Sequence, residues 1–467
     1  MTEDPNFWAQ WLKPSAGFDT LHWSLLLAVA SLVGYLLQRH LNMPKVLGYA
    51  AVGTLAGFLG FSATAWPLQG PALFLLELGV SIVLFECGGR ITLRWFRHNP
   101  MVLVQSLAEA ALTYGAVYFT LRWLDVPATT ATPLALIAMA ASPVVLARVI
   151  NDTRAVGPVT DRAMVLATLS PLYALTLGSA KAEIFARPAA SLWQDITPVL
   201  VVLGVSVAVA ALLCLAMRLA LQWMSPTSEN TSIFMLALIA AATVIAAHLG
   251  GSAPLAALLG GMLLKQLHQR PWAWPRQLGT ASSLLTMLMF VLVSTTAAQA
   301  SWSGAIAVAV IALVVARLLA KSVGVGLGNI GSGASWRQAV WVACAMTPMS
   351  AVALLITSQF AQSAPEAAQA IAGTALPAIL LLELLGAVLA TLAYAGRGAG
   401  VATRQHQRLR PRTLRHRHAA PDGEIPAARQ RGAGDDEQHD RNLHRHLPQR
   451  GRSAGPAQPH SRCTGQK

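Results

Sequence analysis

Apolar stretches of about 20 residues recur along this chain from Leu21 to Tyr394, and each is long enough to cross the ~30 Å hydrocarbon core of a bilayer. Because hydrocarbon offers no partners to backbone polar groups, such stretches must fold as helices. The composition agrees, since 54% of the residues are hydrophobic and only 12% are charged. The sequence therefore predicts an all-α polytopic membrane protein with about thirteen crossings, at residues 21–40, 44–61, 71–91, 101–121, 128–150, 161–181, 194–222, 231–249, 251–266, 280–300, 302–328, 335–360 and 369–395.

Basic residues fall in alternate connections between these segments. Arg39 and Lys45 lie between the first two segments, and Lys321 and Arg337 flank the connection between the eleventh and twelfth. The connections at residues 62–70 and near Ser301 carry no base. Since basic loops stay cytoplasmic, we expect the amino terminus outside and the carboxyl terminus inside a bacterial inner membrane. That orientation requires an odd number of crossings.

The two ends of the chain differ from the apolar body at 21–395. Residues 1–20 are polar and are predicted to lie at the outer interface. Residues 396–467 form a basic tail in which fourteen arginines and one lysine face six acids, a net charge of +9. Its few large apolar residues predict a disordered cytoplasmic segment. It could hold anionic lipid, bind metal through its seven histidines, or be out-of-frame sequence without a role; no nucleic-acid partner is expected.

Two membrane segments are interrupted in matching ways. One reads MAASPVVLARVI, around Ser142 and Pro143, and the other CAMTPMSAVALLI, around Thr347 and Pro348. A proline inside a helix removes a backbone hydrogen bond, and freed groups are tolerated in a membrane only where protein or water satisfies them. Paired interruptions in two halves point to the binding site of a secondary transporter. No HExxH, GxSxG or P-loop motif suggests an enzyme, and the cysteines have no metal-type spacing, so no cofactor is expected.

Several stretches resemble, in order, helices of the monovalent cation:proton antiporter superfamily, especially its second bacterial branch of potassium-efflux and sodium/proton exchangers. They are LNMPKVLGYAAVGTLAGFLG, LLELGVSIVLFECGGRITL, LGGSAPLAALLGGMLLKQ, MFVLVSTTAAQA, VVARLLAKSVGVGL and MTPMSAVALLI. The resemblance implies two inverted five-helix repeats whose fifth and twelfth helices are broken and cross at the midplane. It also implies exchange of Na+ or K+ for H+ by alternating access, and a homodimer formed through the first helices.

The sequence departs from the family at the central position. Family members carry an ion-binding aspartate on the sixth helix, and here that position falls on Ser170-Pro171, in DRAMVLATLSPLYALTLGSAK. Neither residue can titrate. Hydroxyl groups expected near the crossing could coordinate a cation or merely bond to their own helices; they belong to Ser142, Thr168, Ser170, Tyr173, Thr347 and Ser350.

Four acids inside the membrane segments are candidates to replace the missing aspartate, since buried charges there are functional candidates by default. Glu109 is the most central, and serves either as the proton carrier or in an interhelical hydrogen bond. Glu77 is either buried at the interface or part of the site. Glu86 lies four residues before Arg90, so a structural ion pair is its alternative. Glu383 resembles a structural position of the family.

Arg317 lies in the middle of its segment, where the family resembled here carries Lys or Arg near the helix crossing. It could neutralise the carbonyl ends of the broken helices, pair with the ion site, or extend to the cytoplasmic surface. Because arginine stays protonated, it cannot carry the exchanged proton. We expect a cation:proton antiporter; the alternatives are a proton-uncoupled transporter of the same fold, or a membrane sensor or scaffold that does not transport.

Overall fold

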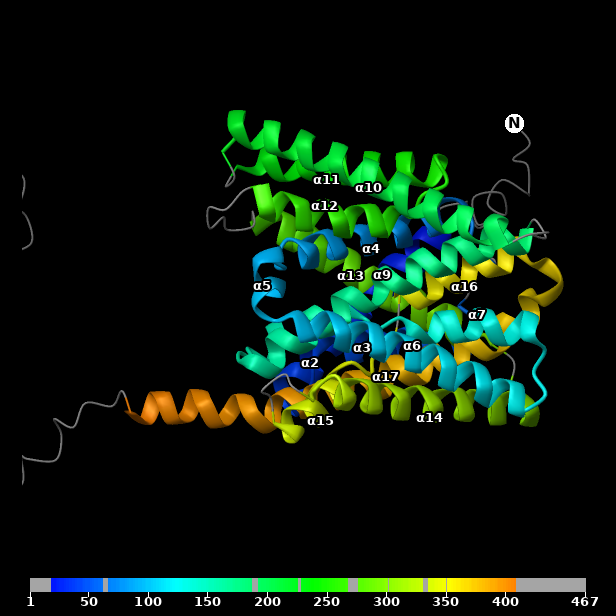
Figure 1. Cartoon of the computed structure of the whole chain (residues 1–467). Helices are drawn as coiled ribbons and strands as arrows, with labels where there is room; N and C mark the ends of the chain where they lie inside the picture. The colour runs from blue at the N-terminus through cyan, green and yellow to red at the C-terminus, as the bar shows by residue number, and fades with distance from the viewer. Residues whose placement is uncertain are drawn as a thin grey trace, which may run out of the picture. The chain divides into compact units, whose positions relative to one another are not determined.

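The computed structural model describes residues 18–61, 66–186, 192–225, 228–267, 276–300, 302–330, 335–349 and 351–408, and within these ranges the regular elements are helices (Figure 1). The first half contains α2 (Phe18–Leu41), α3 (Lys45–Phe58), α4 (Gly70–Gly88), α5 (Leu93–His98), α6 (Pro100–Trp123), α7 (Ala128–Met139), α8 (Pro143–Thr153) and α9 (Pro158–Ala186). The second half contains α10 (Leu192–Trp223), α11 (Glu229–His248), α12 (Ala253–Leu267), α13 (Arg276–Ala298), α14 (Gly304–Leu327), α15 (Trp336–Ala345), α16 (Ala351–Ser363) and α17 (Pro365–Arg408).

Every predicted crossing coincides with one of these helices or with a pair of half-helices. The fifth crossing is the pair α7–α8, and the twelfth is the pair α15–α16. Ten spans in the described residues are long and apolar enough to cross a bilayer, with α7 and α8 counted together; α3 and α12 are shorter apolar helices. The prediction of an all-α polytopic membrane protein is confirmed.

Local sequence explains several helix ends. Ser303 begins α14 by accepting a hydrogen bond from the Ile306 N–H, and Ser335 and Gln338 form a capping box at the start of α15. Gly250 lies between α11 and α12 with φ of 78°, a left-handed conformation that favours glycine. The predicted boundary between the eighth and ninth segments therefore lies where the chain turns.

The helices repeat with inverted direction. The series α3, α4, α6, α7–α8 and α9 is matched by α12, α13, α14, α15–α16 and α17, each with one broken member. The pairing is reciprocal, because α3 packs on α13 as α12 packs on α4, and α6 packs on α14 between the repeats. Since α3 and α12 are an odd number of crossings apart, they run in opposite directions. This is the arrangement that the resemblance implied.

The helices form two groups by their contacts. The core group consists of α6 to α9 and α14 to α17, and the panel group consists of α2 to α4 and α10 to α13. The groups meet where α10 packs on α9, where α17 packs on α13 and α3, and where α8 packs on α4 and α3. Polar bonds cross this boundary: Asp152 on α8 accepts from the Lys45 N–H at 3.0 Å, and Arg148 on α8 donates to Ser283 on α13 at 2.8 Å.

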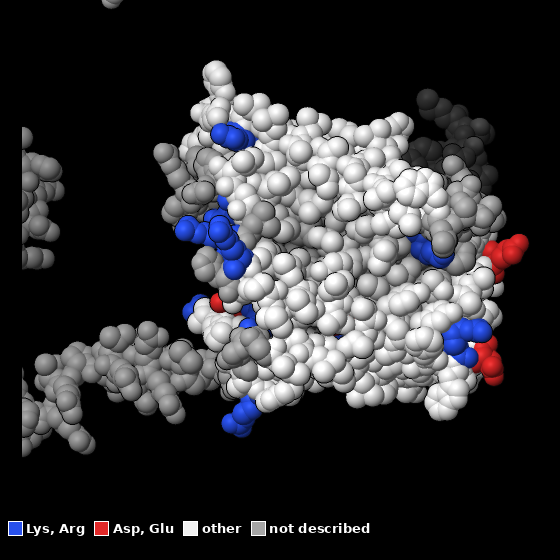
Figure 2. Space-filling model, in the orientation of Figure 1, with Lys and Arg blue, Asp and Glu red and all other residues white. Residues whose placement is uncertain are grey.

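The outer surface suits a bilayer. Figure 2 shows that charged side chains on this face lie towards the two ends of the helices, with an uncharged belt between them. On α14, Val308, Ile311 and Val315 are exposed apolar residues, whereas Leu313 and Arg317 on the same helix are buried. On this helix the exposed face is apolar and the buried face carries a charged residue. A surface helix of a soluble protein has the opposite pattern, and the pattern of α14 is expected for a helix that faces lipid.

Two predicted boundaries need correction or fall outside the structure. The sequence predicts disorder from residue 396, whereas α17 continues as a helix to Arg408. Of the predicted interfacial segment 1–20, only the last three residues are described, and they begin α2. The tail beyond residue 408 lies outside the described residues.

Close packing of α14 on α6 makes Gly324 a sensitive position. A Cβ atom at Gly324 would lie 2.5 Å from the Glu109 Cα atom, which is too close without a backbone shift. We expect Gly324→Ala to lower stability by roughly 1–3 kcal/mol, measured as a lower Tm of the purified protein. Gly326→Ala is the matched control, because its Cβ would meet only Trp336 at 3.5 Å. Equal Tm values for both variants would contradict this packing.

Candidate functional site

The two broken helices cross at their breaks. α7 ends at Met139, the chain is extended at Ala140, and α8 begins at Pro143. The Ser142 N–H donates to the Pro348 carbonyl at 3.0 Å, which joins the two breaks directly. Pro143 is the first residue of α8, where its missing N–H is not needed, and the Ser142 hydroxyl accepts from the Val145 N–H at 3.3 Å. The two Ser/Thr-Pro motifs therefore do mark the crossing.

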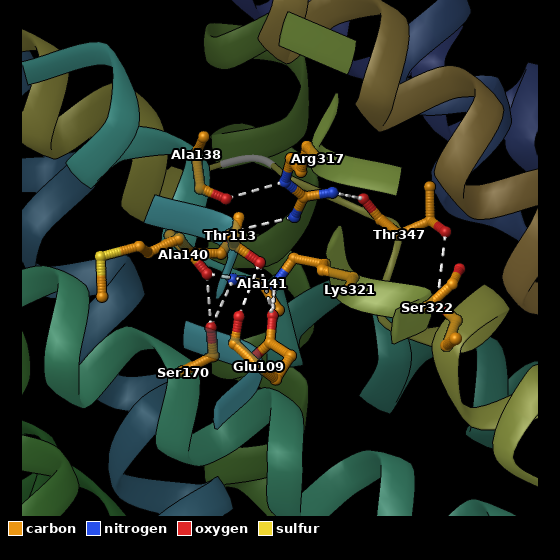
Figure 3. A network of polar contacts seen from close by, with 12 residues as sticks. Glu109, Thr113, Ala138, Ala140, Ala141, Ser170, Arg317, Lys321, Ser322 and Thr347 are labelled. Carbon is orange, nitrogen blue, oxygen red and sulfur yellow. Dashed lines mark hydrogen bonds and ion pairs between the residues drawn. The ribbon is translucent and has the colours of Figure 1, made fainter. Parts of the chain in front are cut away.

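Arg317 on α14 binds the carbonyl ends of both broken helices (Figure 3). Its Nε donates to the Ala138 carbonyl at 2.9 Å, and Nη2 donates to the Ala140 carbonyl at 2.9 Å. Its Nη1 donates to the Thr347 carbonyl at 2.6 Å, with Pro348 O at 3.5 Å from Nη2. The planar guanidinium is suited to this because its donors diverge in a fixed fork.

This arrangement explains how an arginine is tolerated in the middle of the membrane. The carboxyl-terminal end of a helix carries a partial negative charge. The carboxyl-terminal ends of α7 and α15 both lie against the guanidinium of Arg317. The side chain is fully buried, so it does not extend to the cytoplasmic surface. Within the described part of the chain no carboxylate pairs with it. The carbonyl groups at both breaks place negative dipole ends against its positive charge.

Glu109 forms a buried ion pair with Lys321, and sequence reasoning missed this partner. The Lys321 ammonium donates to Glu109 Oε1 and, at 3.2 Å, to the Met139 carbonyl at the first break. The two side chains are 0% and 1% exposed. Counting Lys321 among the bases that flank a cytoplasmic connection is therefore wrong. The sequence did contain a signal that Lys321 faces the crossing. Lys321 lies four residues after Arg317 and hence on the same helix face.

Among the described residues, one oxygen of Glu109 has no hydrogen-bond partner. Oε2 is buried and unpaired, whereas Oε1 accepts from Lys321 and lies 3.4 Å from the Thr113 hydroxyl. The carboxylate thus presents one occupied and one open oxygen beside the crossing. Counted as formal charges, Arg317, Lys321 and Glu109 leave +1, which faces the freed carbonyls of residues 138–140 and 347–348.

Ser170, at the position expected to be acidic, also reaches the first break. Its hydroxyl donates to the Met139 carbonyl at 2.6 Å and accepts from the Ala141 N–H at 3.2 Å. Its neighbours do not share this role. Pro171 lies inside the continuous helix α9, Tyr173 packs on a small cluster containing Phe96, and Thr168 only donates back to Met164 on its own helix at 2.7 Å.

These contacts give Ser170 and Thr168 different expected sensitivities. Ser170→Ala leaves the buried Ala141 N–H without its acceptor, which should cost roughly 1–3 kcal/mol. Thr168→Val removes only a bond within α9 and keeps the side-chain shape, so we expect little change. The Tm values of the two purified variants test this directly. If Thr168→Val were the more damaging variant, Ser170 would not support the break.

The remaining candidates lie apart from the crossing or are only partly engaged there. Glu86 pairs with Arg90 at 2.6 Å, which is the structural alternative, and Glu77 is half-buried on α4. Thr347 contributes its carbonyl, while its hydroxyl bonds back to Ala343 at 3.5 Å.

Ser350 lies outside the described residues. Among the described residues, no cluster of three or more His, Cys, Asp or Glu side chains could hold a metal ion.

Comparison with known proteins supplies the family context for this site. The family model described as "Sodium/hydrogen exchanger, transmembrane" matches residues 27–395. A structure of the sodium proton antiporter MjNhaP1 from Methanocaldococcus jannaschii at pH 8 is similar with a TM-score of 0.64 at 15% identity, covering 82% of this chain and 99% of that chain. An electron-microscopy structure of the same antiporter is similar with a TM-score of 0.66 at 15% identity, covering 82% and 98%. No curated protein matches in sequence.

Proposed function

This chain belongs to the transmembrane sodium/hydrogen exchanger family, and we propose that it exchanges a monovalent cation, Na+ or K+, for protons by alternating access. One observation carries the proposal: the buried Glu109–Lys321 pair lies at the crossing of the broken helices and can bind either a proton or a cation. A titratable pair at this place supplies what Ser170-Pro171 cannot.

The ammonium of Lys321 occupies the position that a cation would take. It lies between Glu109 Oε1 and the Met139 carbonyl, which are oxygen ligands of the kind that hard cations prefer. When a cation binds there, Lys321 gives up one proton and withdraws, so one positive charge replaces another. The proton belongs to the pair rather than to either residue. The unpaired Glu109 Oε2 and the Ser170 hydroxyl, which also contacts Met139 O, offer further oxygens.

Arg317 has a different task in this mechanism. It cannot release its proton, but it holds the carbonyl ends of both breaks in place through four contacts. The position of the Met139 carbonyl, between two residues whose carbonyls Arg317 binds, depends on this clamp. We therefore assign Arg317 to organising the site and the Glu109–Lys321 pair to exchange.

We further propose that the protein is a homodimer in a bacterial inner membrane with a cytoplasmic carboxyl terminus. Support for an apolar contact between the two copies comes from α2. Four apolar residues are exposed along one stripe of this helix: Leu25, Val29, Leu32 and Leu36. Basic residues in alternate connections support the orientation. We propose that the tail beyond α17 is cytoplasmic, as its excess of arginine suggests.

A proton-uncoupled transporter of the same fold is the second candidate. The observation that favours it is the hydroxyl of Ser170 at the family's acidic position, bonded to the backbone of the break. An uncoupled transporter would move its solute without moving protons. It would tolerate loss of the titratable pair but not loss of Arg317.

Inverted membrane vesicles from a host that lacks its own antiporters test the proposal. A pH-sensitive dye reports the proton gradient while Na+, K+ or Li+ is added at several pH values. We expect cation addition to collapse the gradient in vesicles with the protein but not in empty-vector vesicles. No response from protein shown to be inserted and folded would contradict exchange.

A further inference from the structure

Glu383 is a buried carboxyl group that the proposed exchange site does not use. It lies on α17 and is 1% exposed. Its Oε2 accepts a hydrogen bond from the Ser294 hydroxyl on α13 at 3.1 Å, and its Oε1 is buried with no partner in the part of the chain that the structure describes. A structural carboxyl would be expected to have both oxygens satisfied.

The charge environment of Glu383 differs from that of Glu109. Glu109 is neutralised by Lys321, but within the described residues no basic side chain pairs with Glu383. The helices that pack on α17 carry the charged or titratable residues Arg317, Lys321, Arg148, Asp152, Lys45, Tyr49, Arg337 and Cys344. Among the described side chains, none of these forms an ion pair or hydrogen bond with Glu383. The side chain of Arg276, at the start of α13, lies outside the described residues. An unpaired carboxylate at this depth is strongly disfavoured, and this favours the neutral acid at Glu383.

The bond to Ser294 crosses the boundary between the two helix groups. Glu383 belongs to the core group, and Ser294 belongs to the panel group, where Gly53 of α3 approaches it closely. One turn further along α17, Gly386 packs directly on the Pro348 Cα atom at the crossing. Any movement of the crossing relative to α13 therefore changes the surroundings of Glu383.

We propose that Glu383 is a second proton-binding site of the transporter. It holds its proton while α17 rests on α13 as in this structure. When the core group moves away from α13 with the crossing open to one side of the membrane, the carboxyl loses Ser294 and releases its proton to water on that side. It takes up a proton from the other side after the crossing has opened there instead. The inference rests on the proposed function, because it adds one proton to each cycle of the Glu109–Lys321 pair.

The two sites together predict the charge moved in each cycle. Exchange of one cation for one proton at Glu109–Lys321 moves no net charge. An additional proton carried by Glu383 makes each cycle transfer one positive charge. The rate of exchange should then respond to the membrane potential, and this response should depend on Glu383.

Infrared difference spectroscopy of the purified protein in lipid tests the protonation directly. We expect a carboxylic-acid carbonyl band at neutral pH that Glu383→Gln removes and Glu109→Gln keeps. Ser294→Ala is the matched variant, because it removes only the hydrogen bond: the band should persist and shift to higher frequency. A band that persists in Glu383→Gln, or no band in the wild type, would overturn the proposal.

Transport in liposomes with an imposed membrane potential separates the two proposals. We expect wild-type exchange to respond to the potential, and exchange by Glu383→Gln to lose that response, while Ser294→Ala keeps it. Wild-type exchange that ignores the potential overturns the role of Glu383 alone. A wild type that shows the carbonyl band but no exchange overturns the proposed function, and with it the transport role of Glu383.

Discussion

Replacing Glu109 with glutamine is expected to abolish cation-triggered proton movement at every pH. The amide is nearly the same size but cannot carry the negative charge that holds Lys321 or a cation. It also leaves the Lys321 ammonium buried without a counter-charge, which costs roughly 3–5 kcal/mol when one partner of a buried pair is removed. We therefore expect Glu109→Gln to show both a lower Tm and no dye response in vesicles.

A double variant separates the chemical loss from the loss of stability. Glu109→Gln/Lys321→Gln removes both charges, so its Tm should recover towards that of the wild type while exchange remains absent. Glu86→Gln serves as a control for removing an acid from a membrane segment, because Glu86 is partly exposed and paired with Arg90. If Glu109→Gln exchanged cations at the wild-type rate and pH dependence, the pair would not be the site.

Substitution of Arg317 is expected to have the second large effect. Arg317→Met leaves three close carbonyl partners at the ends of α7 and α15 without a donor, and each bond to a charged group contributes roughly 1.5–3 kcal/mol. We expect a large fall in Tm and no measurable exchange. Arg317→Lys should recover only part of either, because a single ammonium cannot reach carbonyls that the guanidinium fork binds from three directions.

Arg122 provides the matched control for this experiment. It is exposed at the end of α6 and donates only to the nearby Val126 carbonyl at 2.8 Å. Arg122→Met should leave both Tm and exchange close to the wild type. Full exchange in Arg317→Met, at normal expression and stability, would show that the broken helices do not need the clamp.

Much of the fold could be predicted because the bilayer restricts what the sequence can do. Apolar length, alternating basic connections and glycine turns indicated the crossings, and each predicted segment coincides with a helix or a pair of half-helices. The breaks could be located because a proline must interrupt the backbone bonds of a helix. A place for Arg317 near those breaks was implied by the resemblance to the antiporter superfamily, with extension to the cytoplasmic surface left as an alternative.

The candidate site could be predicted only in part, because its pairing is non-local. Glu109 and Lys321 are 212 residues apart, and no pattern within α6 identifies α14 as its partner. Lys321 was counted with the bases that flank a cytoplasmic loop, because basic residues near segment ends usually are cytoplasmic. In the structure it is buried on α14, six residues before the end of that helix at Leu327. The bonding of Ser170 to Met139 and Ala141 could not be inferred either, since it depends on how α9 faces the first break.

Measurement of cation affinity at different pH values tests the central claim most directly. In liposomes with purified protein, the rate of cation uptake is recorded against cation concentration at a series of pH values, with Glu109→Gln/Lys321→Gln as the inactive control. If one proton and one cation compete for the Glu109–Lys321 pair, KM for the cation should rise up to about tenfold for each unit that the pH falls, while the saturating rate stays constant. A KM that is the same at every pH, in protein that transports the cation, would contradict competition at this site.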